Sequence, residues 1–343
     1  MIQEEIKDIT DLLSLIFDSN NRIVTIAGLS KNAGKTSFLN FLLNSAPENL
    51  SLAVTTTGHD GEDNDFLTGL KKPKLLLNKN CYFTAIQDTI NPMINSIEIV
   101  KKLPYNVLSK PLYLLKTLQP VQTEIFGPHT VDQQIELCHL LKKMNVQKIF
   151  IDGSLDRKSI ALSPEINNLI LLASPVFGDL NSINIELQKL ISLSSIKKNQ
   201  HKLPKTEYLC YKLNNKIYKT DINSAFKHEK DIISLLSQNL DYIFIPGAIT
   251  DVVFDKLKSA LLNFKGEIII KHPLQIMTSA YSTSLILKTN ISSLNPFPLN
   301  AIALNSFSTD NKHLDCVSFR NKIRSAFPSI PVIDAQEFIS QNS

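Results

Sequence analysis

Two kinds of apolar pattern alternate along the first half of the chain. Apolar positions at a helical period predict helices over residues 3–17, 35–44 and 131–143. Short continuous apolar runs predict buried strands: RIVTIAG (22–28), LSLAVTTTG (50–58), PLYLLKTL (111–118), KIFID (148–152) and NLILLAS (168–174). Strands that alternate with helices are typical of a mostly parallel sheet covered on both faces.

The alternation resumes after a polar stretch, SSIKKNQHKLPKTE (194–207). Further strands are predicted from EYLCY (207–211), DYIFIPGAITD (241–251), GEIIIKHP (266–273), SLILKT (284–289), NAIALNSF (300–307) and IPVIDA (330–335), with helices over 251–264 and 315–326. A chain of 343 residues is long for one core. We therefore expect an α/β protein with a doubly wound, mostly parallel sheet over residues 1–205. A smaller α/β domain over residues 206–343 is expected to pack against it or to meet a partner.

Composition narrows the class of protein. Hydrophobic residues make up 43% and charged residues 20% of the chain, which suits a globular fold. The net charge of +4 is diffuse, with no basic run interleaved with aromatics, so we expect no nucleic-acid partner. No apolar run reaches the roughly 18 residues of a membrane span. The acidic start MIQEEIKDITDLLSLIF lacks a positive leader, and the four cysteines are isolated, which favours a cytoplasmic protein with no membrane association.

The segment GLSKNAGKTS (28–37) stands between the first predicted strand and the helix over 35–44. Gly34-Lys35-Thr36 in this context is the centre of a Walker A loop, whose backbone N–H groups and helix N-terminus form a concave anion site. We expect Lys35 to reach the β- and γ-phosphates and Thr36 to ligate Mg²⁺. The first domain is therefore predicted to be of the P-loop NTPase type, with ATP or GTP and Mg²⁺ as cofactors.

The spacing of this loop departs from the usual signature. The first glycine normally lies five residues before the second, where this chain has Leu29, and Gly28 comes one residue earlier. A glycine-containing turn with solvated lysines is the alternative. If the loop binds a nucleotide, Lys31 is a weaker candidate for cofactor binding than its neighbours. Lys35 is expected to be catalytic as well as cofactor-binding. The predicted cofactor-binding residues are Ser30, Lys31, Asn32, Ala33, Gly34, Lys35, Thr36 and Ser37.

Acidic residues follow two of the predicted strands. KIFIDG places Asp152 at the end of an apolar strand, and the carboxyl ends of parallel strands face the crevice where ligands bind. Carboxylates are hard oxygen ligands suited to Mg²⁺, so Asp152 is the Walker B candidate. The alternative is that Asp152 caps the turn before Gly153.

A second acidic cluster, TTTGHDGEDND (55–65), begins where the second predicted strand ends. We expect Asp60 to bind the metal or to orient the attacking water, and Glu62 to be a further catalytic candidate. His59 is a candidate for contact with phosphate or with a partner. A solvated loop rich in turn-forming residues is the alternative.

Taken together, these motifs resemble a bacterial family, the P-loop subunit of the reactivating factor for cobalamin-dependent lysine and ornithine aminomutases. The matching segments are GLSKNAGKTS, TTTGHDGEDND, IDGSLDRKSIA, PGAITD and IPVIDA, and they are spread over nearly the whole chain. KNAGKT with a downstream DGE is the most specific part. The family commonly carries arginine where this chain has His59.

The resemblance implies an ATPase that restores an aminomutase whose cobalamin has been damaged, by opening the enzyme so that the spent cofactor leaves. The implied partners are a cobalamin- and PLP-dependent aminomutase and, as a further candidate, a second reactivase subunit, with the oligomeric state left open. Such action needs a two-state element biased by the γ-phosphate and its metal, for which residues 58–65 are the natural candidate.

Two other functions remain open from the residues alone. One is a metabolic kinase or ATP-dependent ligase resembling dethiobiotin synthetase, which shares the loop and the architecture. The other is a nucleotide-sensing scaffold without turnover. The chain lacks an NKxD-like base-reading motif, so its sequence does not distinguish ATP from GTP.

Overall fold

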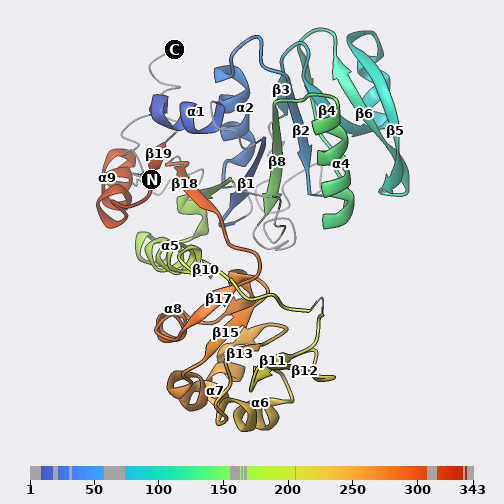
Figure 1. Ribbon diagram of the computed structural model, residues 1–343. Coiled ribbons are helices and arrows are strands. Elements are labelled where there is room, and N and C mark those ends of the chain that lie inside the picture. Colours follow the sequence, from blue (N-terminus) through green and yellow to red (C-terminus); the bar gives the residue numbers. More distant parts are fainter. Residues whose placement is uncertain are drawn as a thin grey trace. The chain divides into compact units, whose positions relative to one another are not determined.

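The computed structural model describes residues 9–17, 22–30, 33–57, 74–154, 163, 165, 168–204, 206–306, 315–334 and 337. The chain divides into two compact units (Figure 1). Unit 1 comprises residues 1–183 and 299–343, and unit 2 comprises residues 184–298. The boundary falls within the helix α5 (Leu180–Ser194).

A large sheet forms the centre of unit 1. In the described residues it has nine strands in the order β19-β18-β9-β1-β8-β2-β4-β6-β5. The strands from β19 to β4 in that order are parallel, and β6 is antiparallel to both β4 and β5. The strands are β1 (Ile23–Gly28), β2 (Leu52–Thr56), β4 (Tyr82–Ile86), β5 (Ile97–Val107), β6 (Lys110–Thr117), β8 (Lys148–Ser154), β9 (Leu169–Ala173), β18 (Leu299–Leu304) and β19 (Val332–Asp334). A separate antiparallel pair joins β3 (Leu75–Leu77) to β7 (Val121–Thr123).

Helices pack on both faces of this sheet. One buried cluster joins Phe38 of α2 to Ile26 and Phe150 of the sheet, and it also includes residues of α1. A second cluster joins Leu137 of α4 to Ile149, the sequence neighbour of Phe150. Successive side chains of a strand point to opposite faces, so the two clusters lie on opposite sides of the sheet. The helices of unit 1, besides α5, are α1 (Ile9–Phe17), α2 (Lys35–Ser45), α3 (Gln87–Ile90), the 3-10 turns η1 (Asn91–Ser96) and η3 (Pro175–Phe177), α4 (Val131–Lys143) and α9 (Cys316–Ala326).

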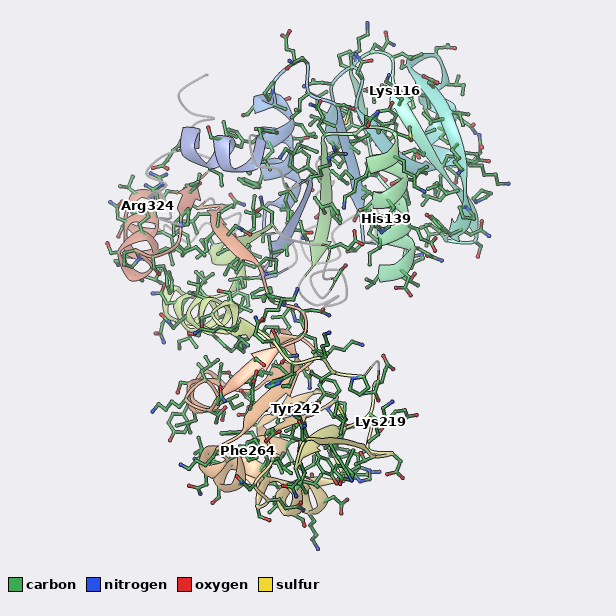
Figure 2. The ribbon with its side chains drawn as sticks, in the orientation of Figure 1. Lys116, His139, Lys219, Tyr242, Phe264 and Arg324 are labelled. Atoms are coloured by element: carbon green, nitrogen blue, oxygen red, sulfur yellow. The ribbon has the colours of Figure 1, made fainter. Side chains whose placement is uncertain are left out.

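Unit 2 has a smaller mixed sheet, which includes Tyr242 of β13 (Figure 2). The side chain of Tyr242 is buried. The order of its described strands is β10-β17-β15-β13-β11-β12, with β11 antiparallel to both of its neighbours. The same unit contains a two-stranded parallel pair, β14 with β16. The elements are β10 (Lys197–Lys198), β11 (Cys210–Leu213), β12 (Lys216–Lys219), α6 (Glu229–Leu236), β13 (Tyr242–Phe244), β14 (Ile249–Thr250), α7 (Asp251–Asn263), β15 (Glu267–Ile270), η4 (Pro273–Gln275), β16 (Ile276–Met277), α8 (Ala280–Ile286) and β17 (Ile291–Ser293).

The predicted α/β class with a large, mostly parallel sheet is confirmed, but the chain is divided differently from the expected 1–205 and 206–343. Residues from Leu299 onward return to the large sheet, where β18 pairs in parallel with β9. The polar stretch 194–207 is no boundary, because β10 lies inside it and pairs with β17 of unit 2. The segment SLILKT, predicted as a strand, instead contains the end of α8, which Ser279 caps through the backbone N–H of Ser282.

Two further properties of the chain concern membranes and cysteines. No helix in the described part of the chain is long and apolar enough to cross a membrane. The four cysteines are unpaired: Cys81, Cys138 and Cys210 are buried, and Cys316 is partly exposed. Burial raises the pKa of the Cys81 and Cys138 thiols to about 12, so both stay protonated at neutral pH.

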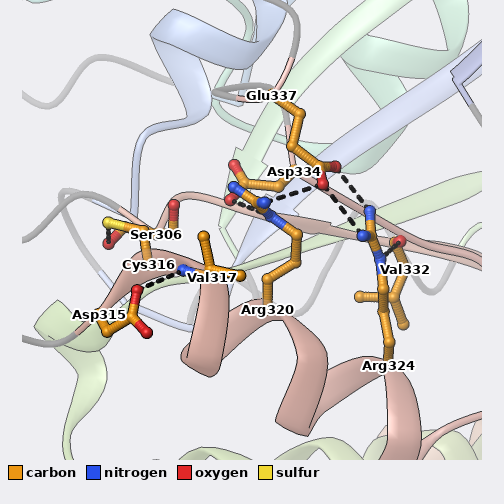
Figure 3. A network of polar contacts seen from close by, with 9 residues as sticks. All are labelled: Ser306, Asp315, Cys316, Val317, Arg320, Arg324, Val332, Asp334 and Glu337. Carbon is orange, nitrogen blue, oxygen red and sulfur yellow. Dashed lines mark hydrogen bonds and ion pairs between the residues drawn. The ribbon is translucent and has the colours of Figure 1, made fainter. Parts of the chain in front are cut away.

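A network of charged side chains fastens α9 to the end of β19 (Figure 3). Arg320 Nε donates to the carboxylate of Asp334 at 3.1 Å, and Asp334 is fully buried. The carboxylate of Glu337 lies 2.9 Å from Arg320 Nη1 and accepts two bonds from the guanidinium of Arg324. Arg324 Nε also donates to the carbonyl of Val332 at 3.1 Å. Two arginines one helical turn apart therefore hold the last strand of the large sheet.

We predict that Arg320→Met lowers the free energy of unfolding by about 3 kcal/mol, because it removes an ion-pair partner of a buried carboxylate. Urea unfolding followed by circular dichroism measures this difference. The matched control is Lys322→Met, an exposed lysine on the same helix, which is expected to stay within about 0.5 kcal/mol of the unchanged chain. Equal stabilities of the two variants would contradict the assigned role of the network.

Candidate functional site

The topology of the large sheet singles out the carboxyl end of β1. After β1 the chain forms β2, β4, β5 and β6 on one side of it. It then returns to β8, which is the immediate neighbour of β1 on that side. It then continues on the other side of β1 through β9 and β18. In open parallel sheets, ligands bind at the carboxyl edge where the strand order reverses in this way. The predicted phosphate loop follows β1 at this place.

Gly28 is required by the close return of the chain over the end of β1. A Cβ on Gly28 would lie 2.9 Å from the carbonyl oxygen of Ser30 and 3.1 Å from Cβ of Ala33. The side chain of Lys35 also passes over this point, since its Cδ would lie 3.5 Å from such a Cβ. The backbone N–H of Leu29 donates to Leu172 of β9 at 2.9 Å, which prolongs the sheet by one residue before the turn. The position of Gly28, one residue earlier than in the usual motif, therefore has a steric reason.

Gly34 forms the junction between the loop and α2. Its backbone is left-handed, with φ 90° and ψ 19°, and its carbonyl accepts the N–H of Phe38 to begin the helix. The first N–H groups of a helix have no acceptor within it, and the helix dipole favours an anion there. The first turn of α2 carries no acidic residue. This end of α2 is therefore suited to bind an anion.

Other predicted loop residues surround this junction. Ala33 is buried, whereas Lys35 and Thr36 are partly exposed and Ser37 is exposed. The Oγ atom of Ser30 is buried and has no hydrogen-bond partner among the described residues. The structure thus brings Ser30 and residues 33–37 together at the end of β1.

Asp152 lies on β8, between β1 and β2. It is opposite Ile26 on one side and Thr56 on the other, and it is partly exposed. The alternation along β8 places Asp152 on the same face as Phe150, which packs in the cluster that contains α2 residues. Its backbone carbonyl accepts the Oγ1 of Thr56 and the N–H of Thr57, both at 3.0 Å. The Walker B candidate therefore shares an edge and a face of the sheet with the loop.

Several predicted residues lie outside the described residues: Lys31, Asn32, His59, Asp60 and Glu62. Their roles stay predictions. Within the described ranges, no group of three or more His, Cys, Asp or Glu side chains is arranged to hold a metal ion. Of the residues predicted to hold Mg²⁺, Thr36 and Asp152 lie in the described part of the chain.

Comparison with known proteins gives no match. No protein-family model, curated protein or solved structure is similar to this chain.

Two features of the edge were not predicted from the sequence. Gly127 passes so close to β2 that a Cβ there would lie 1.8 Å from the carbonyl oxygen of Thr56. The side chain of Asn305, directly after β18, lies against Gly34. The signal for Asn305 was present in NAIALN, where a polar residue follows an apolar run, as Asp152 does in KIFID.

We predict that Gly34→Ala lowers the free energy of unfolding by about 1–2 kcal/mol, because an L-residue is strained in a left-handed conformation. The new Cβ would also lie 2.5 Å from Nδ2 of Asn305, which forces that side chain to move. Urea unfolding is the measurement. Ser37→Ala, an exposed change in the same helical turn, is the control and is expected to be nearly neutral. A Gly34→Ala variant as stable as the control would contradict the conformation described for Gly34.

Proposed function

We propose that the chain is a Mg²⁺-dependent NTPase of the P-loop type, which binds ATP or GTP at the carboxyl edge of the large sheet. The observation that carries this proposal is the left-handed Gly34 between β1 and α2, with Lys35 folded back over Gly28. In phosphate-binding loops the backbone N–H groups converge on one point, and the glycine that precedes the helix contributes to this arrangement.

Each described residue has a distinct role in the proposed site. The N–H groups at the start of α2 and the hydroxyl of Ser30 are donors for phosphate oxygens. The ammonium of Lys35 balances the negative charge of the β- and γ-phosphates. The Thr36 hydroxyl and the Asp152 carboxylate would hold Mg²⁺, which neutralises charge on the transferred phosphoryl group.

The pairing of β2 with β8 supports a role for the second acidic cluster. Thr56 and Thr57 lie at the start of the segment TTTGHDGEDND, and both bond to the backbone carbonyl of Asp152. That segment therefore starts beside the strand that carries the Walker B candidate. Asp60 remains our proposed second metal ligand or water-orienting group, and Glu62 a further catalytic candidate.

The aminomutase part of the proposal comes from the motif segments. Their resemblance to the reactivating-factor subunit suggests that ATP turnover drives release of damaged cobalamin from a cobalamin- and PLP-dependent aminomutase, in the cytoplasm. In this proposal, the large sheet and its loop supply the nucleotide-dependent part of the cycle. We infer that the chain acts with a protein partner, since the motif segments outside the loop also match that family.

Substitution of the loop lysine tests nucleotide binding. We predict that Lys35→Ala weakens the affinity for MgATP or MgGTP by about 100-fold, because charge-assisted bonds to phosphate are lost. Isothermal titration calorimetry with each nucleotide measures the affinity. Lys143→Ala, which removes an exposed lysine at the end of α4, is the control and should bind as the unchanged chain does. Equal affinities of the two variants would argue against a phosphate loop at residues 28–37.

A turnover assay tests the partner. We predict slow ADP release from MgATP by the chain alone and an increase of about tenfold or more when inactivated lysine or ornithine aminomutase is added. The rate is measured by coupled ADP detection, with active aminomutase and an unrelated protein as controls. Fast turnover that depends on a small metabolite would instead indicate a metabolic kinase or ligase. Binding without ADP release under any condition would indicate a nucleotide-sensing scaffold.

A further inference from the structure

Asn305 approaches the phosphate loop from the far side of β9. It directly follows β18, and its backbone N–H donates to the carbonyl of Ala173 at the end of β9 at 3.0 Å. Its backbone is therefore held by the sheet. A Cβ built on Gly34 would lie 2.5 Å from Nδ2, 2.9 Å from Cγ and 3.0 Å from Cβ of Asn305. The whole length of the side chain thus lies along Gly34.

The strand pattern explains why Asn305 reaches the loop. Ala301 and Ala303 belong to the buried cluster that contains α2 residues, so these small side chains lie on the face of the sheet that α2 covers. The alternation of the strand carries Asn305 to the same face. In the alternating series Ala301, Ala303, Asn305, only Asn305 has a polar side chain. It directly follows the last residue of β18.

The chemistry of Asn305 also distinguishes it from a packing residue. Its side chain is only partly buried, and its amide makes no hydrogen bond to the described residues. An amide offers two N–H donors and one carbonyl acceptor, so it can serve either kind of partner near the loop. Because the two ends of an amide have nearly the same shape, the packing contact with Gly34 is the basis of the proposed role, whichever end carries the nitrogen.

We propose that Asn305 is a positioning residue for the phosphate loop, holding Gly34 in its left-handed conformation. Glycine has more backbone freedom than any other residue, and a free loop must lose that freedom when it binds an anion. The sheet holds the backbone of Asn305, and its side chain packs on Gly34. This packing restricts the loop before an anion binds, so less conformational entropy is lost on binding. The inference rests on the proposed nucleotide site and adds to it a residue from the segment of unit 1 that follows unit 2.

The test uses two probes on the full chain. Isothermal titration calorimetry with magnesium tripolyphosphate measures binding by the loop without a base, and the same titration with MgATP includes the base. We expect Asn305→Ala to weaken both affinities by the same factor, about five- to tenfold. Asn305→Asp keeps the size of the side chain but places a carboxylate next to the anion, and we expect a larger loss, about 30-fold or more, for both probes.

A matched control lies on the same strand. Asn300 Oδ1 accepts the N–H of Leu169 at 3.1 Å, near the opposite end of β18. We expect Asn300→Ala to lower the melting temperature without changing either affinity, whereas the Asn305 variants change affinity more than melting temperature. An equal loss of affinity in Asn300→Ala would overturn the proposal, because general weakening of the sheet would then explain the effect.

The remaining outcomes separate this inference from the proposed function. If the unchanged chain binds neither probe, the nucleotide site and the role of Asn305 both fail. If it binds both probes and the Asn305 variants bind equally well, only the role of Asn305 fails. If the variants lose affinity for MgATP alone, Asn305 contacts the base and does not position the loop, which also overturns the proposal.

Discussion

The return of the chain over Gly28 is the constraint on which the candidate site depends. The carbonyl of Ser30 comes closer to the end of β1 than any side chain at position 28 would allow. This approach lets β1 run directly under the loop and lets Lys35 lie back across the strand end. The edge of the sheet is crowded again at Gly127, where the chain touches the end of β2. At both places backbone packs directly against backbone.

Local features of the sequence predicted the elements around this edge well. A strand, two glycines and a helix start are all encoded within 16 residues, and each has a physical requirement that can be recognised without a structure. The place of Asp152 was predicted for the same reason, since a carboxylate after an apolar strand has few places to lie in a parallel sheet. The loop departs from the usual spacing, but the contact between Gly28 and Ser30 shows that the earlier glycine has a steric role.

Features that depend on distant pairing, or on a turn without its usual residues, were not predicted. An apolar strand does not encode which sheet it joins, so NAIALNSF was assigned to the second domain although β18 completes the large sheet. The hairpin between β5 and β6 was not predicted because its turn residues, Leu108 and Ser109, both have positive φ without the usual Asn-Gly signal. Asn305 was missed for the first of these reasons, because its significance depends on where β18 pairs.

The discontinuity of unit 1 has a consequence for biosynthesis. All residues of β9 are buried in the finished protein, but one edge of this strand stays unpaired until β18 has left the ribosome, after the whole of unit 2 has been made. An apolar strand edge exposed for that long is prone to pair with other chains. Nascent chains that stall between residues 184 and 298 should therefore depend on chaperones, and a message truncated before Leu299 should yield aggregates instead of a partly active protein.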